Sequence, residues 1–416
     1  MRLLRPLRTR EMALLWGGLS LSAVGDQLYA VALSWIAVGV FGAAAGYLAA
    51  LQAAVVLVAA LGIGRWADQW DAQGSMIGAD AVRAAALLLL VAVWLANGGP
   101  TAGALVAAVA ILAAGQAVFQ PAMQVVLPRM VPDPTLLPAA NALMDGTERS
   151  ARLLGPGLVA MLAGLVPTVH FLTLDAASFL FSAAAVVLIR RSRPILLTRP
   201  PLKESIWQSV TRGARAMTAH PLLGFVLRIT AVVNGAWYAA FYLALPLLIE
   251  QRGLHGPGGT GLGAFGLVIA AYGFTNILTT LTLGGRAMPR RPQFQMFCGS
   301  IIVGIGTAGM GVASLLPPGW ALPAIAAAAA FGAIGGPMKD IPVSVLRQTR
   351  LAGSDLGAGM RTYIAATSAG TLVALLAAPA ILLRIGTAPT IELCGLAMVT
   401  IAVLGLVRHR LWQEPD

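Results

Sequence analysis

The sequence predicts an all-α membrane protein with about twelve transmembrane helices in two similar six-helix halves. The chain is 58% hydrophobic and 11% charged, with a mean hydropathy of +0.81, whereas soluble domains carry roughly a quarter charged residues. Its apolar residues form long stretches, most of them near the roughly twenty residues needed to cross about 30 Å of hydrocarbon. A weak repeat relates the two ends of the chain.

Polar, Pro or Gly breaks divide the chain into twelve apolar stretches. The predicted spans are residues 12–40, 45–64, 75–96, 101–126, 140–165, 168–189, 221–249, 261–284, 294–316, 320–344, 357–383 and 388–407. The longest polar segment falls halfway along the chain. We therefore expect an N-terminal half at residues 1–189, a cytoplasmic linker at 190–220 and a C-terminal half at 221–416.

The repeat has a spacing of 216 residues. Pro121 recurs as Pro337, and the start of the fifth predicted span, with Ala142 and Met144, recurs at the start of the eleventh as Ala358 and Met360. Parallel six-span repeats are a known membrane architecture, with a path between the halves near mid-membrane. The repeat therefore indicates that the two halves face one another across a central path.

The net charge of +12 is unevenly distributed. Most Lys and Arg residues lie at the two termini or in alternate loops, which predicts that both termini are cytoplasmic. This placement argues against nucleic-acid binding. The two cysteines lack metal-ligand spacing, so no metal or cofactor is expected.

Asp26 is the most unusual residue, because it falls deep within the first predicted span. An ionisable side chain there is costly unless it faces water or a partner, and it is a functional candidate by default. Ser22 and Tyr29 share its helix face. We expect Asp26 to bind and release a transported proton. The alternative is a structural role, with Asp26 capping a kink at Gly25 or bonded permanently to a neighbouring helix.

The seventh predicted span presents Asn234, Tyr238 and Tyr242 at intervals of four residues. Such a face stacks against an amphipathic substrate, although aromatic residues at helical spacing also serve plain packing. Tyr242 lies 216 residues beyond Asp26, which predicts that the two face each other across the cavity. We expect Ser22 and Tyr29 to line the same cavity.

Charged residues cluster at the predicted cytoplasmic ends of three other spans. They form either a gate that opens as the halves rock or a static set of ion pairs between helices, and the sequence leaves both interpretations open. They are Asp145, Glu148, Arg149 and Arg152 in the fifth span, Lys339 and Asp340 in the tenth, and Arg361 in the eleventh. Asp175, in the sixth span, is interpreted as a helix-packing residue.

The junction of the second and third spans contains Gly64 and Asp68 in the pattern Gly-x-x-x-Asp. It resembles the loop signature of the major facilitator superfamily, which implies two rocking halves and alternating access. By this resemblance Asp68 is a latch between the halves, together with Arg83 and with Arg361 as a possible partner. Gln69 and Ala72 stand where the family usually has cations, so the charge relay is incomplete.

Other motifs resemble particular branches of this family. Ser22 to Asp26 and Asp80 to Arg83 are similar to the macrolide-efflux and siderophore-exporter branch. The fourth span has Gln116, and no arginine, where many proton-coupled drug antiporters have an arginine. The resemblance implies a secondary transporter that exports a siderophore-like or drug-like compound across a bacterial inner membrane, coupled to protons.

We expect this transporter to work as a monomer in the lipid bilayer, with a small-molecule substrate and no cofactor. The alternatives are an importer or a lipid flippase of the same fold. A membrane enzyme is less favoured, because the sequence contains no recognisable catalytic constellation.

Overall fold

The computed structural model describes residues 4–62, 71–131, 136–194, 206–284, 291–351 and 353–408. Within these residues the secondary structure is helical, without strands. The prediction of an all-α fold is confirmed. This outcome follows from the solvent: in hydrocarbon a helix satisfies its own backbone hydrogen bonds, whereas an open strand edge does not.

Six long helices make up the first part of the chain. They are α1 (Arg10–Phe41), α2 (Ala45–Gly62), α4 (Ala72–Asn97), α5 (Ala102–Met130), α6 (Leu137–Leu162) and α7 (Val169–Ser192), with short 3-10 segments η1 (Arg5–Arg8) and η2 (Gly42–Ala44).

The second part begins with a shorter helix, α8 (Ile206–Ala219). The helices that follow are α9 (Pro221–Tyr238), α10 (Leu245–Gln251), α11 (Gly261–Gly284), α12 (Pro292–Ala313), α13 (Pro318–Arg350), α14 (Gly353–Ile385) and α15 (Thr387–Arg408), with a π-helical segment η4 (Ala239–Ala244) and a 3-10 segment η5 (Pro257–Gly259).

Ten helical segments in the described part of the chain are long and apolar enough to cross a membrane. The first of them, Arg10–Val58, contains both α1 and most of α2. Helix α6 is not among the ten, and its sequence contains two acidic and two basic residues within two turns. The chain is an integral membrane protein, and the count of twelve spans stays a prediction.

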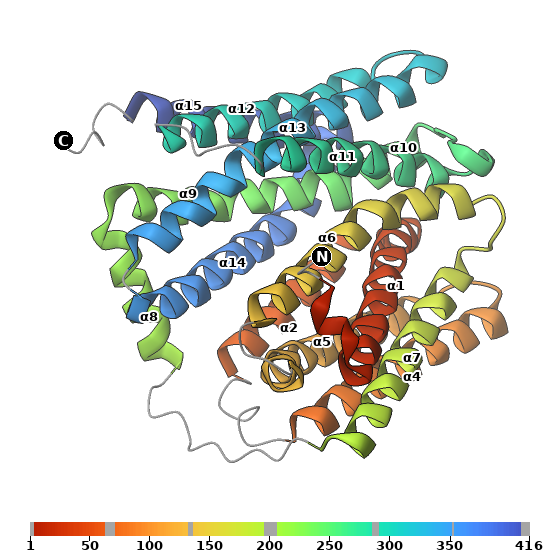
Figure 1. Cartoon of the computed structure of the whole chain (residues 1–416). Helices are drawn as coiled ribbons and strands as arrows, with labels where there is room; N and C mark the ends of the chain where they lie inside the picture. Colours follow the sequence, from red (N-terminus) through yellow and green to blue (C-terminus); the bar gives the residue numbers. More distant parts are fainter. Residues whose placement is uncertain are drawn as a thin grey trace.

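The helices pack in two groups, visible in Figure 1 as α1–α7 on one side and α9–α15 on the other. In the first group α7 packs against α1 and α4, and α4 packs against α5. In the second, α12 packs against α13 and α15, and α14 packs against α9. The groups meet where α6 contacts α11 and where α2 contacts α14.

Small residues permit this close approach of the two groups. A Cβ atom on Gly266 of α11 would lie 2.9 Å from the Ala160 nitrogen and 3.0 Å from the Pro156 oxygen of α6. A Cβ atom on Gly46, at the start of α2, would lie 2.8 Å from Leu243 and from Pro379. Larger side chains at these positions would force the groups apart.

Two regions differ from the sequence expectation. The seventh predicted span is not one continuous α-helix: α9 ends at Tyr238, and a π-helical turn precedes α10. The linker contains the amphipathic helix α8, which packs on α14 and α9. There the Thr362 hydroxyl donates to the Val210 carbonyl at 2.8 Å. A polar segment was expected to be loop, because its apolar face became evident only with a partner helix.

Candidate functional site: a cavity between the two groups of helices

A cavity of about 700 Å³ lies between the two helix groups. Helices α1, α2, α5 and α6 supply most of one side, and α9, η4 and α14 supply the other. Side chains of 36 residues line it, most of them apolar or uncharged. The volume is in the range of small-molecule sites, about 300–1,000 Å³.

The cavity brings together all six residues that the sequence assigned to it. They are Ser22, Asp26 and Tyr29 from α1, Asn234 and Tyr238 from α9, and Tyr242 from η4. The shared helix face of the first three follows from their spacing. Their roles in transport stay predictions.

Asp26 is exposed to the cavity and stands apart from the other charges that line it. Within the described part of the chain it has no hydrogen-bond or ion-pair partner. Arg83, Asp80 and Glu148 act on it only through longer-range electrostatics. Glu148, the other acid that lines the cavity, is instead paired with Arg152 at 2.6 Å.

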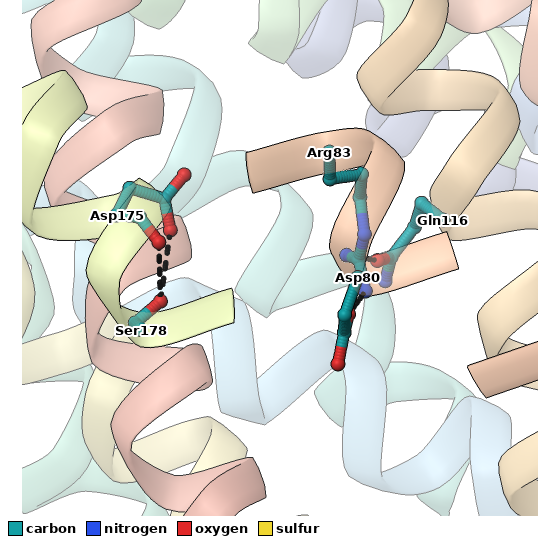
Figure 2. A network of polar contacts seen from close by, with 5 residues as sticks. All are labelled: Asp80, Arg83, Gln116, Asp175 and Ser178. Carbon is teal, nitrogen blue, oxygen red and sulfur yellow. Dashed lines mark hydrogen bonds and ion pairs between the residues drawn. The ribbon is translucent and has the colours of Figure 1, made fainter. Parts of the chain in front are cut away.

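Arg83 lies inside the protein, at the cavity wall, and is 2% exposed. It forms an ion pair with Asp80, one turn earlier on α4, and donates a 2.6 Å hydrogen bond to Gln116 of α5 (Figure 2). The sequence grouped Arg83 with a latch near the cytoplasmic loop. Because α4 begins at Ala72, Arg83 is eleven residues into the helix, or about 16 Å along its axis.

Aromatic rings hold the guanidinium in place. Its carbon lies 4.8 Å from the ring centroid of Phe119 and 4.2 Å from that of Phe179, which are cation–π distances. A Cβ atom on Gly115 would lie 2.6 Å from Arg83 Cγ, so glycine makes room for the arginine stem. In this way α4 supplies an arginine beside Gln116, where the sequence of the fourth span contained none.

Asp175 of α7 is fully buried, and it does not line the cavity. The Ser178 hydroxyl lies 3.2 Å from its Oδ1 and 2.8 Å from its backbone oxygen (Figure 2). A Cβ atom on Gly25 would lie 2.6 Å from Oδ1, so the carboxyl packs against the α1 backbone next to Asp26. The sequence interpretation of Asp175 as a simple packing residue missed this neighbourhood.

The opposite wall is aromatic. Tyr238 and Tyr242 stack with ring centroids 5.7 Å apart and an interplanar angle of 29°. Trp237 contacts both, at 5.2 Å and 5.7 Å, and also lines the cavity. The π-helical turn between Tyr238 and Leu245 alters the helical register at this wall, and such turns occur frequently at functional sites.

The candidate gate residues do not form one group. Glu148 and Arg152 line the cavity and are more than half exposed. Lys339 and Asp340 pair with each other at 3.1 Å on α13 and lie outside the cavity lining. Each described pair joins neighbours on a single helix, and the gating role stays a prediction.

Four of the predicted latch and gate residues lie partly or wholly outside the description. Asp68 is outside the described residues, and only the backbone is described for Asp145, Arg149 and Arg361. Their roles as latch or gate residues stay predictions.

Several uncharged polar residues of the cavity were not anticipated. They are Gln27, Ser34, Gln52, Gln116, Gln120, Thr147, Thr367, Ser368 and Thr371. Glutamines within apolar spans were the available signal, because a buried amide in lipid needs a partner or water. These side chains give the cavity hydrogen-bonding capacity without net charge.

Comparisons with known proteins agree with this architecture. The family model described as Major Facilitator Superfamily matches residues 15–352. No curated protein matches the chain. Solved structures of similar fold include a POT family transporter in complex with a thioalcohol-conjugated peptide, with a TM-score of 0.69, 11% identity and 96% of each chain covered.

Two further structures show the same fold. One is a POT family transporter in complex with 5-aminolevulinic acid, with a TM-score of 0.70, 11% identity and 96% of each chain covered. The other is a mutant of the peptide transporter POT, with a TM-score of 0.72, 12% identity, and coverage of 96% of this chain and 94% of that one. Identities this low show the fold alone.

The family match covers most of the chain, and the two helix groups enclose a cavity of small-molecule size. The predicted resemblance to a transporter family is confirmed, and the fold is that of a transporter rather than an enzyme. The chain therefore belongs to the major facilitator superfamily and is a secondary transporter.

Proposed function

We propose that this chain exports a small organic compound, siderophore-like or drug-like, by proton antiport across a bacterial inner membrane, with both termini in the cytoplasm. The carrier alternates between inward-facing and outward-facing states as its two halves rock. Asp26 carries the coupling proton, and the aromatic wall of Trp237, Tyr238 and Tyr242 binds the substrate.

The observation that carries the proposal is the unpaired carboxyl of Asp26 on the cavity surface. Arg83 and Glu148 also line the cavity, but each has a charged partner within its own helix. A carboxylate in a low-dielectric cavity either binds a proton or attracts a cationic group. Alternation between these two states is the property that proton antiport requires.

Export rests on the resemblance of the first and third spans to exporters. Uptake through the same cavity is the alternative direction, and a lipid flippase is a further alternative. The uncharged polar lining supports a polar organic compound over a lipid, since Gln52, Gln120 and Thr371 offer hydrogen bonds that acyl chains do not use.

Proteoliposomes loaded with a pH-sensitive dye test the proposal. The purified protein receives an imposed pH gradient and a panel of amphipathic cationic dyes, hydroxamate chelators and dipeptides. We expect at least one dye or chelator to drive counterflow of protons in the wild type. Asp26→Asn should abolish this flux, because an amide does not bind and release a proton in this pH range.

The matched control is Asp71→Asn, which changes an aspartate that is 40% exposed, paired with Arg190 and outside the cavity lining. It should retain the flux. Unchanged proton-coupled flux in Asp26→Asn would contradict the coupling role. Proton movement in the same direction as the substrate would replace export by uptake.

A further inference from the structure

Asp175 is a carboxyl group sealed behind the cavity wall. It is 0% exposed, its Oδ1 lies near the Ser178 hydroxyl, and its Oδ2 has no hydrogen-bond partner among the described residues. A buried ionised carboxylate with an unsatisfied oxygen carries a large desolvation cost. A helix-packing role alone does not explain a carboxyl at this place.

The charged and titratable groups around Asp175 come from the two helices that pack against α7. Helix α1 contributes Asp26 and Tyr29, and α4 contributes Asp80 and Arg83. Arg83 is the single cation in this set, and it is already bound to Asp80 and Gln116. One guanidinium thus faces three carboxyl groups.

Asp26 and Asp175 are therefore left without a directly bound cation. Gly25, the residue before Asp26, packs against Oδ1 of Asp175, so the two acids sit at one contact between α1 and α7. Two carboxylates that repel each other in a medium of low dielectric do not both ionise readily, and such a pair retains a proton.

We propose that Asp26 and Asp175 bind one proton between them, which makes Asp175 a second proton-binding group of the carrier. The inference rests on the proposed coupling role of Asp26. Asp26 exchanges the proton with the cavity, and Asp175 sets the pH at which that exchange occurs. Asp175 is thus a positioning residue for the proton, with no contact to the substrate.

Infrared titration of the purified, detergent-solubilised protein tests this directly, because a protonated carboxyl has a C=O stretching band that disappears on ionisation. The wild type should lose this band in two separate steps, as expected for a coupled pair. Asp175→Asn should leave one step for Asp26, with a midpoint about one pH unit below the upper wild-type step, because the repelling charge is gone.

Ser178→Ala is the second variant. It removes the hydroxyl that stabilises ionised Asp175 and keeps the carboxyl, so the upper step should move to higher pH. Shifts of opposite sign in the two variants support the proposal, whereas a structural role alone predicts lower thermal stability without them.

Two outcomes overturn the inference. One is a wild-type titration with a single step that is unchanged in Asp175→Asn. The other is an upper step that Ser178→Ala leaves in place. Either result leaves proton antiport intact if Asp26→Asn abolishes flux in proteoliposomes. Conversely, retained flux in Asp26→Asn removes the proposed coupling whatever the infrared titration shows.

Discussion

The interiors of the two halves are built on different principles, although the repeat relates them residue by residue. In the first half, α4 and α5 meet through Asp80, Arg83 and Gln116. At a spacing of 216 residues the second half has Met296, Gly299 and Gly332 in their places. A buried charged network on one side thus corresponds to small and apolar residues on the other.

The second half gains its cohesion from backbone contact. A Cβ atom on Gly299 of α12 would lie 2.7 Å from the Gly335 oxygen and 2.8 Å from the Lys339 nitrogen of α13. Gly306 packs in the same way against Gly332. Helices that approach this closely gain dispersion energy without polar groups.

The difference separates two tasks. The first half holds the titratable groups Asp26 and Asp175 beside a fixed cation, and the second half presents the aromatic rings of Tyr238 and Tyr242. Under our proposals, proton chemistry belongs to one half and substrate contact to the other. Rocking of the halves then couples the two tasks.

The largest expected effect comes from breaking the charged network. Arg83→Met leaves Asp80 buried without its partner, and breaking a buried ion pair on one side costs about 3–5 kcal/mol. We expect a marked fall in the melting temperature of the purified protein, measured by a fluorescence thermal-shift assay in detergent.

The double variant Asp80→Leu with Arg83→Met is the matched control, since it makes the first half resemble the second. It should recover most of the lost stability, because removal of both partners of a buried pair is often nearly neutral. A double variant as unstable as Arg83→Met would mean that packing, and not charge, dominates at this site.

An intermediate effect is expected from glycine in the second half. Gly299→Ala forces a methyl group against the α13 backbone, and overpacking of this kind costs about 1–3 kcal/mol. Gly309→Ala on the same helix is the control, because its Cβ would lie 3.4 Å from the Ala328 Cβ, where a small shift suffices. Equal melting temperatures for the two variants would argue against the close contact.

The smallest effect concerns the aromatic wall. Tyr242→Ala removes the ring that stacks on Tyr238, a contact worth about 0.5–1.5 kcal/mol, which corresponds to about a two- to tenfold loss of affinity for an aromatic substrate. Tyr242→Phe keeps the ring and should bind nearly as well as wild type. Tryptophan-fluorescence quenching by the transported dye measures both, and equal affinities would remove the ring from the substrate site.

The structure also shows which inferences from sequence were within reach. The six predicted cavity residues follow from helical periodicity, because Ser22, Asp26 and Tyr29 must share a face once α1 is a helix. The position of Arg83 was out of reach. Its depth depends on where α4 begins, and its partners on α5 and α7 depend on packing that periodicity does not report.

By itself the sequence determined the membrane environment, the helical fold and the family. These follow from apolar length, from the need to satisfy backbone hydrogen bonds in lipid and from a loop motif. Only the tertiary structure decided that Arg83 is spent on Asp80 and Gln116, that Asp175 lies behind Asp26, and that α9 turns through a π-helix at the cavity. Which charges remain unpaired depends on distances between helices, and those distances arise only when the helices pack.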